Sequence, residues 1–301
     1  MSKTNFATSL MQQVYAKRNA LCVGLDPHLS HIPRCFRQGS MQPGEKATVK
    51  AVESFISVVL DRIADQVAVV KPQISFFELL GGAGMEILDS LCRRAKHLRL
   101  KVILDAKRGD IGSTCDAYAE VYLGSNTPYD ALTVNPYMGL ESLSAFVDRC
   151  MDNDKGLFVL VKTSNPGSKE FQELDVGGQP LYQKVAAELH KLVQSKLQPQ
   201  QEWSNFGAVV GATFPEQAAQ LRQILPNSLF LIPGYGAQGG SLNDAISGLV
   251  KREQGLSGGI INSSRGVLFP RQIAEANAAD WEKGFDNNLK QICQEFSEYY
   301  P

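Results

Sequence analysis

The sequence predicts an α/β protein built as a closed (β/α)8 TIM barrel. Short apolar segments alternate eight times with longer segments of helical periodicity, which is the pattern of a parallel sheet covered by helices. Several short segments are apolar throughout, as expected of strands that are buried on both faces. A chain of 301 residues suits one barrel with insertions. We therefore expect a single catalytic domain that spans residues 1–301.

The apolar segments are rich in β-branched residues and are short enough to be strands. The predicted strands are, in chain order, Leu21–Leu25, Val67–Val70, Lys101–Leu104, Ala131–Val134, Leu157–Val161, Phe206–Gly211, Leu229–Ile232 and Gly259–Ile261.

The segments between them repeat apolar residues with a period near that of a helix. An open doubly wound sheet is the alternative architecture, but no G-x-G-x-x-G follows the first predicted strand, which favours the barrel. The predicted helices are Ala47–Ala64, Met85–Leu98, Leu140–Cys150, Leu181–Leu197 and Glu216–Leu225.

Composition argues against several classes of protein. A formal net charge of −1 without a long run of like charges gives no nucleic-acid face. The segment Met1–Ala20 has no apolar core of a signal peptide, and no apolar run approaches the ~20 residues of a membrane span. The six cysteines have no zinc-ligand spacing, so we expect reduced thiols and a cytoplasmic location.

The third predicted strand runs into a group of charged residues. Asp105 and Lys107 are two positions apart and should point to the same side of the strand. Asp110 follows after Gly109, which we expect to turn the chain sharply. Charged side chains at the inner rim of a barrel usually take part in binding or catalysis. A structural ion pair is the alternative.

The first and second predicted strands end in the same manner. Asp26 follows the first strand, and Lys71 follows the second, where Pro72 should stop the ladder. Alternating lysine and aspartate side chains favour each other's charged forms. Charged residues after three neighbouring strands predict an active site at this end of the barrel.

The last two strands end in glycines and an arginine. A glycine-rich segment, Pro233–Gly240, follows the seventh strand, and Arg265 follows the eighth. Barrels often bind phosphate there, and arginine can bind phosphate with two hydrogen bonds. Two connections are long, His28–Glu45 and Ser164–Pro180. The second holds several glycines and is a candidate lid, with a tolerated insertion as the alternative.

The four histidines predict neither a metal site nor a Ser-His-Asp triad. His97 and His190 lie on predicted helices and are expected at the surface, while His28 and His31 lie in the loop after the first strand, where a structural role is favoured. We infer no metal.

At these positions the chain resembles orotidine 5′-phosphate decarboxylases. The family motif D-x-K-x-x-D is met by Asp105, Lys107 and Asp110, and its fuller form D-x-K-R-G-D-I resembles the longer class of the family. The resemblance covers nearly the whole chain. It includes Asp26, Lys71, Ser164-Asn165-Pro166-Gly167, Pro233–Gly239 and Arg265.

The resemblance implies a role for each charged residue. Lys107 would donate a proton to C6 of the pyrimidine, and Asp105 with Asp110 of the facing subunit would flank the leaving carboxylate. Lys71 and Asp26 would hold the ribose hydroxyls and orient the charges. The implied reaction converts orotidine 5′-phosphate to UMP and CO₂, the last step of de novo pyrimidine nucleotide synthesis.

The remaining implied contacts are with ribose, base and phosphate. Thr114 of the facing subunit would touch the ribose, Ser164 would read the pyrimidine, and Gln238 with Arg265 would bind the phosphate. The family is a homodimer without metal or organic cofactor. This chain is longer than compact members in two regions, including Gly167–Asn205, which leaves its lid contacts unassigned.

Three alternatives share part of this pattern. Sugar-phosphate barrel enzymes, such as a keto-gulonate phosphate decarboxylase or a hexulose phosphate synthase, carry the same motif but use Mg²⁺ and should have an acidic residue in place of Lys71. A Schiff-base aldolase would also use a lysine. A catalytically silent nucleotide-binding barrel would not need all the charged residues.

Overall fold

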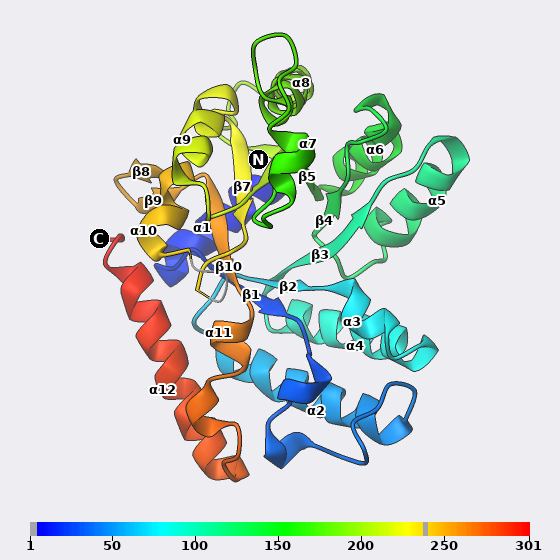
Figure 1. The fold of residues 1–301 in the computed structure, drawn as a ribbon, viewed down its shortest axis with the longest axis vertical. Helices are drawn as coiled ribbons and strands as arrows, with labels where there is room; N and C mark the ends of the chain where they lie inside the picture. Colours follow the sequence, from blue (N-terminus) through cyan, green and yellow to red (C-terminus); the bar gives the residue numbers. More distant parts are fainter. Residues whose placement is uncertain (1–4, 237–239) are drawn as a thin grey trace.

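The computed structural model describes residues 5–236 and 240–301, and within them eight parallel strands close a barrel. The order around the barrel is β1-β2-β3-β4-β5-β6-β7-β10, and helices surround it (Figure 1). The predicted closed barrel is confirmed. Its strands are β1 (Leu21–Leu25), β2 (Val69–Pro72), β3 (Lys101–Arg108), β4 (Ala131–Val134), β5 (Gly156–Lys162), β6 (Ser204–Val210), β7 (Ser228–Ile232) and β10 (Gly259–Ser263).

Four strands extend further than predicted at the end that carries the site. β2 reaches Pro72, β3 reaches Arg108, β5 reaches Lys162 and β10 reaches Ser263. Pro72 pairs with Leu25 and is the last residue of β2, so the strand ends at the proline that was predicted to stop it. The apolar pattern placed the strand ends too early, because the strands continue through the polar residues of the site.

The five predicted helices are present with small shifts at their ends. Glu141–Leu143 forms a 3₁₀ turn, so the helix that was expected from Leu140 begins only at Ser144. His190 is half-buried rather than at the surface. The helices are α2 (Lys46–Ile63), α4 (Gly82–His97), α6 (Ser144–Asn153), α8 (Leu181–Lys196) and α9 (Pro215–Ile224).

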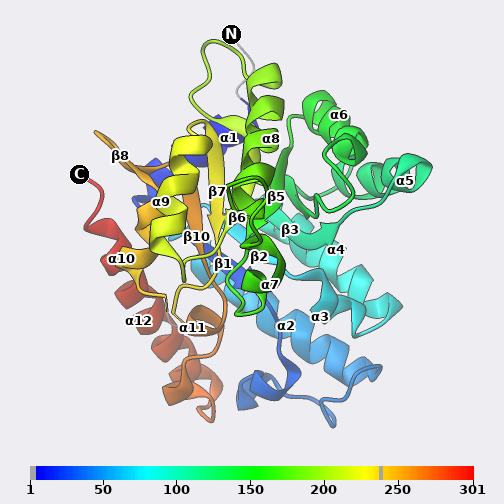
Figure 2. The same ribbon diagram turned by 45° about the horizontal axis from the view of Figure 1, so that its top comes forward.

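Other elements were not predicted. The hairpin of β8 (Val250–Arg252) and β9 (Gly255–Ser257) is antiparallel and lies outside the barrel. α7 lies beside β5 and α8 (Figure 2). The unpredicted helices are α1 (Phe6–Lys17), α3 (Ile74–Glu78), α5 (Gly112–Leu123), α7 (Ser168–Gln172), α10 (Leu242–Ala245), α11 (Arg265–Leu268) and α12 (Ala278–Ser297).

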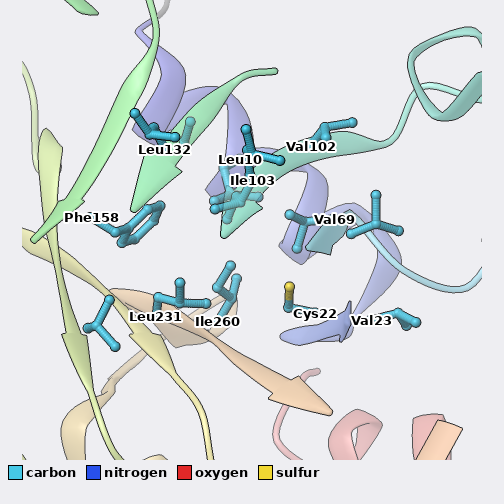
Figure 3. Packing of buried hydrophobic residues seen from close by; sticks show 14 of the residues in the cluster. Leu10, Cys22, Val23, Val69, Val102, Ile103, Leu132, Phe158, Leu231 and Ile260 are labelled. Carbon is cyan, nitrogen blue, oxygen red and sulfur yellow. The ribbon is translucent and has the colours of Figure 1, made fainter. Parts of the chain in front are cut away.

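Apolar side chains fill the barrel, and α1 closes its amino-terminal end. Figure 3 shows Cys22, with its sulfur toward the interior, among residues of the neighbouring strands. The rings of Phe6 in α1 and Phe158 in β5 lie 6.4 Å apart. A β-carbon at Gly156 would lie 2.3 Å from the Phe6 ring, so the start of β5 needs glycine for α1 to pack. The opposite end is left for a cavity.

None of the helices within the described ranges is both long and apolar enough to cross a membrane.

Candidate active site

A cavity of about 920 Å³ opens at the carboxyl ends of the barrel strands. This is the end where barrel enzymes place their active sites. The cavity brings together residues from β1, β2, β3, β5 and β10, as the sequence predicted. The predicted site residues that line it are Asp26, Lys71, Asp105, Lys107, Ser164 and Arg265.

Three charged side chains on β2 and β3 form a connected group, which we call the charged group: Lys71, Asp105 and Lys107. The Lys71 Nζ lies 2.7 Å from Asp105 Oδ2, and the Lys107 Nζ lies 2.6 Å from Asp105 Oδ1. Lys71 and Asp105 are buried, whereas the side chain of Lys107 is 44% exposed. Lys107 is thus the member that faces open space.

Electrostatics keeps Lys71 and Asp105 charged in spite of their burial. Burial alone would raise the pKa of Asp105, but Lys71 and Lys107 outweigh it and hold that pKa well below its usual range. Burial alone would lower the pKa of Lys71, but Asp105 and Asp26 outweigh it and raise that pKa. At neutral pH the cavity wall therefore holds fixed charges of both signs.

The backbone of β3 is irregular where it carries these residues. Lys107 has a φ of 48°, in the left-handed region that non-glycine residues rarely adopt. The register with β4 shifts between Leu104 and Arg108, which marks a bulge. Gly109 is not among the left-handed residues; a β-carbon there would lie 2.8 Å from the carbonyl oxygen of Asn135. The turn expected at Gly109 is therefore made at Lys107, and Gly109 permits a close approach.

Asp26 enters the cavity directly after β1. Its Oδ1 is buried and has no hydrogen-bond partner in the described part of the chain. A β-carbon at Gly24 would lie 1.9 Å from the Ser264 Oγ, so glycine lets the ends of β1 and β10 approach each other. An unpartnered buried oxygen beside a cavity is suited to a donor group of a ligand.

Gly234 of the glycine-rich segment and Arg265 line the cavity after β7 and β10. Gly234 and Gly236 have φ values of 105° and 76°, and the Gly236 N–H donates to the Gly240 carbonyl. Arg265 begins α11, is exposed and lines the cavity. Gln238 lies outside the described residues.

The loop after β5 is tied to the barrel by a buried lysine. Lys162, at the end of β5, is 0% exposed, and its Nζ lies 2.9 Å from both Ser168 Oγ and Glu173 Oε1. The same Nζ lies 4.2 Å from the ring centroid of Phe214. These contacts hold α7 and the predicted lid segment against the barrel, next to Ser164.

Similarity to known proteins establishes the family of this chain. The model of the orotidine 5′-phosphate decarboxylase / HUMPS family matches residues 19–279. The chain belongs to this family. An orotidine 5′-phosphate decarboxylase of Rhodopirellula baltica is 40% identical over 97% of this chain and 98% of its own length. One of Caldicellulosiruptor bescii is 38% identical over 88% and 90%.

Two solved structures of related proteins share the fold. The OMP decarboxylase of Leishmania donovani superposes with a TM-score of 0.74 at 33% identity and covers 98% of each chain. The UMP synthase of the same organism gives a TM-score of 0.76 at 35% identity, and this chain matches 56% of its length. The family assignment and the barrel thus agree.

Two residues of the decarboxylase motif region do not line the cavity of their own chain. Asp110 is half-buried, and its Oδ1 accepts from the Ile111 N–H at 2.8 Å. Thr114 is exposed on α5. The cavity-lining set contains neither residue.

The histidines after β1 pack against aromatic rings. The His28 ring lies 4.4 Å from that of Phe76, and the His31 ring lies 5.6 Å from that of Phe269. These contacts fit the structural role that was predicted.

Sequence reasoning missed several residues at the site, and two of them have contacts that bear on the chemistry or the loop. Thr133 on β4 lines the cavity and contacts Asp105, and Lys162 holds the loop after β5. Each gave a usable signal, because a polar residue interrupts or ends an apolar strand segment there.

Proposed function

We propose that this chain decarboxylates orotidine 5′-phosphate to UMP and CO₂ in pyrimidine nucleotide synthesis, with Lys107 as the proton donor. The reaction follows from the family and from 40% identity to a decarboxylase over nearly the whole chain. One observation carries the mechanism: the charged group, in which Lys107 is the exposed member next to buried Asp105 and Lys71.

Decarboxylation at C6 leaves an electron pair that the pyrimidine cannot delocalise. The bond between C6 and the carboxylate breaks, CO₂ leaves, and the Lys107 ammonium gives its proton to C6. Solvent then returns a proton to the neutral amine. The ammonium stabilises the developing negative charge before it gives up the proton, and its position is set in advance by Asp105. The Asp105 carboxylate beside the leaving carboxylate favours its departure as neutral CO₂.

Asp26 and Ser164 orient the nucleoside in this proposal. The unpartnered Oδ1 of Asp26 accepts a ribose hydroxyl, and Lys71 beside it fixes the local charge. Ser164 lines the cavity at the start of the loop after β5, where it can read an edge of the pyrimidine.

The phosphate lies at the ends of β7 and β10. Arg265 lines the cavity there, and a guanidinium can bind two phosphate oxygens at once. Gln238, by the resemblance, completes this contact. Binding energy from the phosphate is then available to stabilise the transition state at C6.

We propose that the chain acts as a homodimer in which Asp110 and Thr114 complete the partner's cavity. Both residues lie outside the cavity of their own chain. Apolar side chains are exposed on the loops that follow β2, β3 and β4: Leu79 at 53%, Ile111 at 62% and Tyr137 at 89%. An interface between two copies of the chain would bury these exposed apolar groups.

No divalent metal takes part in this mechanism, because Lys71 and Lys107 supply the cations. The sugar-phosphate alternative would require an acidic ligand where β2 carries Lys71. The six free thiols support the cytoplasmic location predicted from the sequence.

The reaction is tested by following the loss of substrate absorbance when orotidine 5′-phosphate is added to the purified protein. Turnover should persist after exhaustive EDTA treatment. Loss of activity that Mg²⁺ restores would favour the sugar-phosphate alternative, and trapping of a covalent adduct by borohydride would favour the aldolase. Absence of turnover in a protein that binds UMP would indicate the silent barrel.

The shared site is tested by mixing two inactive variants, Lys107→Ala and Asp110→Ala, and refolding them together. A mixed dimer then has one cavity with both lesions and one with none. With random mixing of a two-fold dimer, roughly a quarter of wild-type activity should return. No recovery, with mixed dimers present by mass, would show that both residues serve the same cavity.

A further inference from the structure

A single buried hydroxyl on β4 contacts three consecutive residues of β3. Thr133 is 1% exposed. Its Oγ1 accepts the backbone N–H groups of Ala106 at 3.0 Å and Lys107 at 2.9 Å. The same hydroxyl donates to Asp105 Oδ1 at 3.0 Å.

The direction of this hydroxyl is fixed by its neighbours. A threonine hydroxyl has one hydrogen and can accept two hydrogen bonds. The N–H groups of Ala106 and Lys107 are both donors, so they occupy the accepting positions, and the hydrogen must point to Asp105. The Thr133 hydroxyl therefore donates one hydrogen bond and accepts two, which is its full capacity.

The two N–H groups need this side chain because β3 leaves the regular ladder at this point. Leu104 pairs with Leu132 and Arg108 pairs with Val134, and the residues between them form the bulge. A buried N–H without an acceptor is costly. The Thr133 hydroxyl supplies the acceptor that the β4 backbone does not.

The bulge also contains the residue in an unfavourable conformation. Lys107 has a φ of 48°, and such a conformation persists only where surrounding contacts enforce it. One of those contacts is the bond from its N–H to Thr133. The same hydroxyl shares Asp105 Oδ1 with the Lys107 ammonium, so it acts on both ends of the lysine.

We propose that Thr133 is a positioning residue of the decarboxylase site. It holds the left-handed turn that points Lys107 into the cavity, and it fixes the carboxylate of Asp105 against which the ammonium is aimed. This inference rests on the proposed function, because it assigns Thr133 to the same charged group.

Three substitutions separate the hydroxyl from the methyl group. Thr133→Val keeps the shape and removes the hydroxyl, Thr133→Ser keeps the hydroxyl and removes the methyl, and Thr133→Ala removes both. Thr48→Val is the matched control, because Thr48 is 0% exposed and its hydroxyl has no hydrogen-bond partner within the described residues. The measurements are kcat and KM for orotidine 5′-phosphate, UMP affinity and thermal unfolding.

Thr133→Val should lower kcat by about 10²-fold, the usual effect of misplacing a reacting group by an ångström. KM and UMP affinity should change little, because Asp26 and Arg265 are unaffected. Thr133→Ser should retain most of kcat, and Thr48→Val should behave as wild type. If Thr133→Val does not fold, the pair of Ser and Ala variants decides: a far lower kcat for Ala supports the proposal, and equal kcat values overturn it.

Two other outcomes overturn the proposal. A folded Thr133→Val with wild-type kcat shows that the hydroxyl is not needed. A loss of kcat in the Ser variant as large as in the Ala variant shows that packing of the methyl group, not hydrogen bonding, is at work. Lys107→Ala is measured alongside: if it remains active, the proposed mechanism fails; if it is inactive while Thr133→Val is fully active, only the role of Thr133 fails.

Discussion

The strands β3 and β5 both place a lysine at the same end of the barrel, but the two lysines have opposite environments. Lys107 of β3 is 44% exposed on its side chain and lines the cavity. Lys162 of β5 is fully buried and bonded to Ser168 and Glu173 of the following loop. Lys107 faces the cavity, and Lys162 holds the loop after β5 in place.

The difference comes from local irregularity in each strand. By simple alternation Lys162 should face the same side as Leu160, which lines the cavity. The register between β5 and β6 shifts between these two residues, so Lys162 is directed to the loop instead. In β3 the corresponding shift accompanies the left-handed Lys107. A bulge next to an active site thus decides which charged residue reaches the cavity.

The largest effect is expected when the cavity-facing lysine is removed. Lys107→Ala should lower turnover by more than about 10²-fold, since a general acid is usually worth ~10²–10⁴-fold. UMP should still protect the variant against thermal unfolding, because the ribose and phosphate contacts remain. Retained turnover would show that Lys107 is not the proton donor, so the two lysines would not differ in chemical role.

Arg265→Ala tests a cavity-facing cation that is remote from the reacting carbon. It should cost roughly 2–5 kcal/mol in kcat/KM, the range for removing one partner of a desolvated charge pair. Orotidine, which lacks the phosphate, is the matched control substrate and should be nearly insensitive. Equal losses with both substrates would place Arg265 elsewhere than at the phosphate.

Lys162→Met should have a smaller effect and one of a different kind. Removing one partner of an ion pair leaves the other charge uncompensated, but the Glu173 side chain is 29% exposed and stays hydrated, so the unfolding temperature should fall only slightly. The loop that carries Ser164 loses its anchor, so KM should rise while kcat changes less. Lys191→Met, at an exposed position on α8, is the control. A fall in kcat without a change in KM would mean that Lys162 acts on the chemistry.

The smallest effect concerns the pH dependence of the loop anchor. The hydrogen bond from Lys162, with a second from Gln217, holds the pKa of Glu173 below its usual range. Because the pKa of Glu173 is lowered in the folded protein, its ion pair with Lys162 stabilises the loop fully at pH values above the ordinary pKa of glutamate. This stabilisation is lost as the pH falls through the lowered pKa. The KM ratio of Glu173→Gln to wild type should therefore exceed one at pH 7 and approach one below pH ~4.

Titration of the substrate phosphate affects both proteins alike, so it cancels in this ratio. A ratio that stays constant from pH 7 to acid would show that Glu173 does not act through its charge.

The sequence predicted the strands where burial alone determines them. Segments such as Leu21–Leu25 and Ala131–Val134 are correct to the residue, because both faces are covered and the apolar run is continuous. The strand ends of β2 and β3 were missed because functional lysines and aspartates interrupt that run. α12 was also missed, although Trp281 and Phe285 follow a helical spacing.

The candidate site was predictable as a set of residues but not as a geometry. Asp26, Lys71 and Arg265 follow or end strands, and the shared end of the barrel brings them together. The bulge at Lys107 depends on Thr133, which is distant in sequence, so no local pattern reveals it. The strand pattern marks Lys162 itself, but it does not reveal the contact with Glu173 in the loop that follows β5.

The cysteine inside the barrel has a practical consequence. Burial raises the pKa of Cys22 to about 12, and thiol reagents and oxidants attack the thiolate form. Cys22 is therefore almost inert at neutral pH, although it lies close to the charged group. Maleimide dyes should instead modify the half-buried thiols, which are Cys35 on the loop after β1 and Cys293 on α12. With Cys293 replaced by serine, a spectroscopic label can be attached at Cys35 while the thiol beneath the active site stays unmodified.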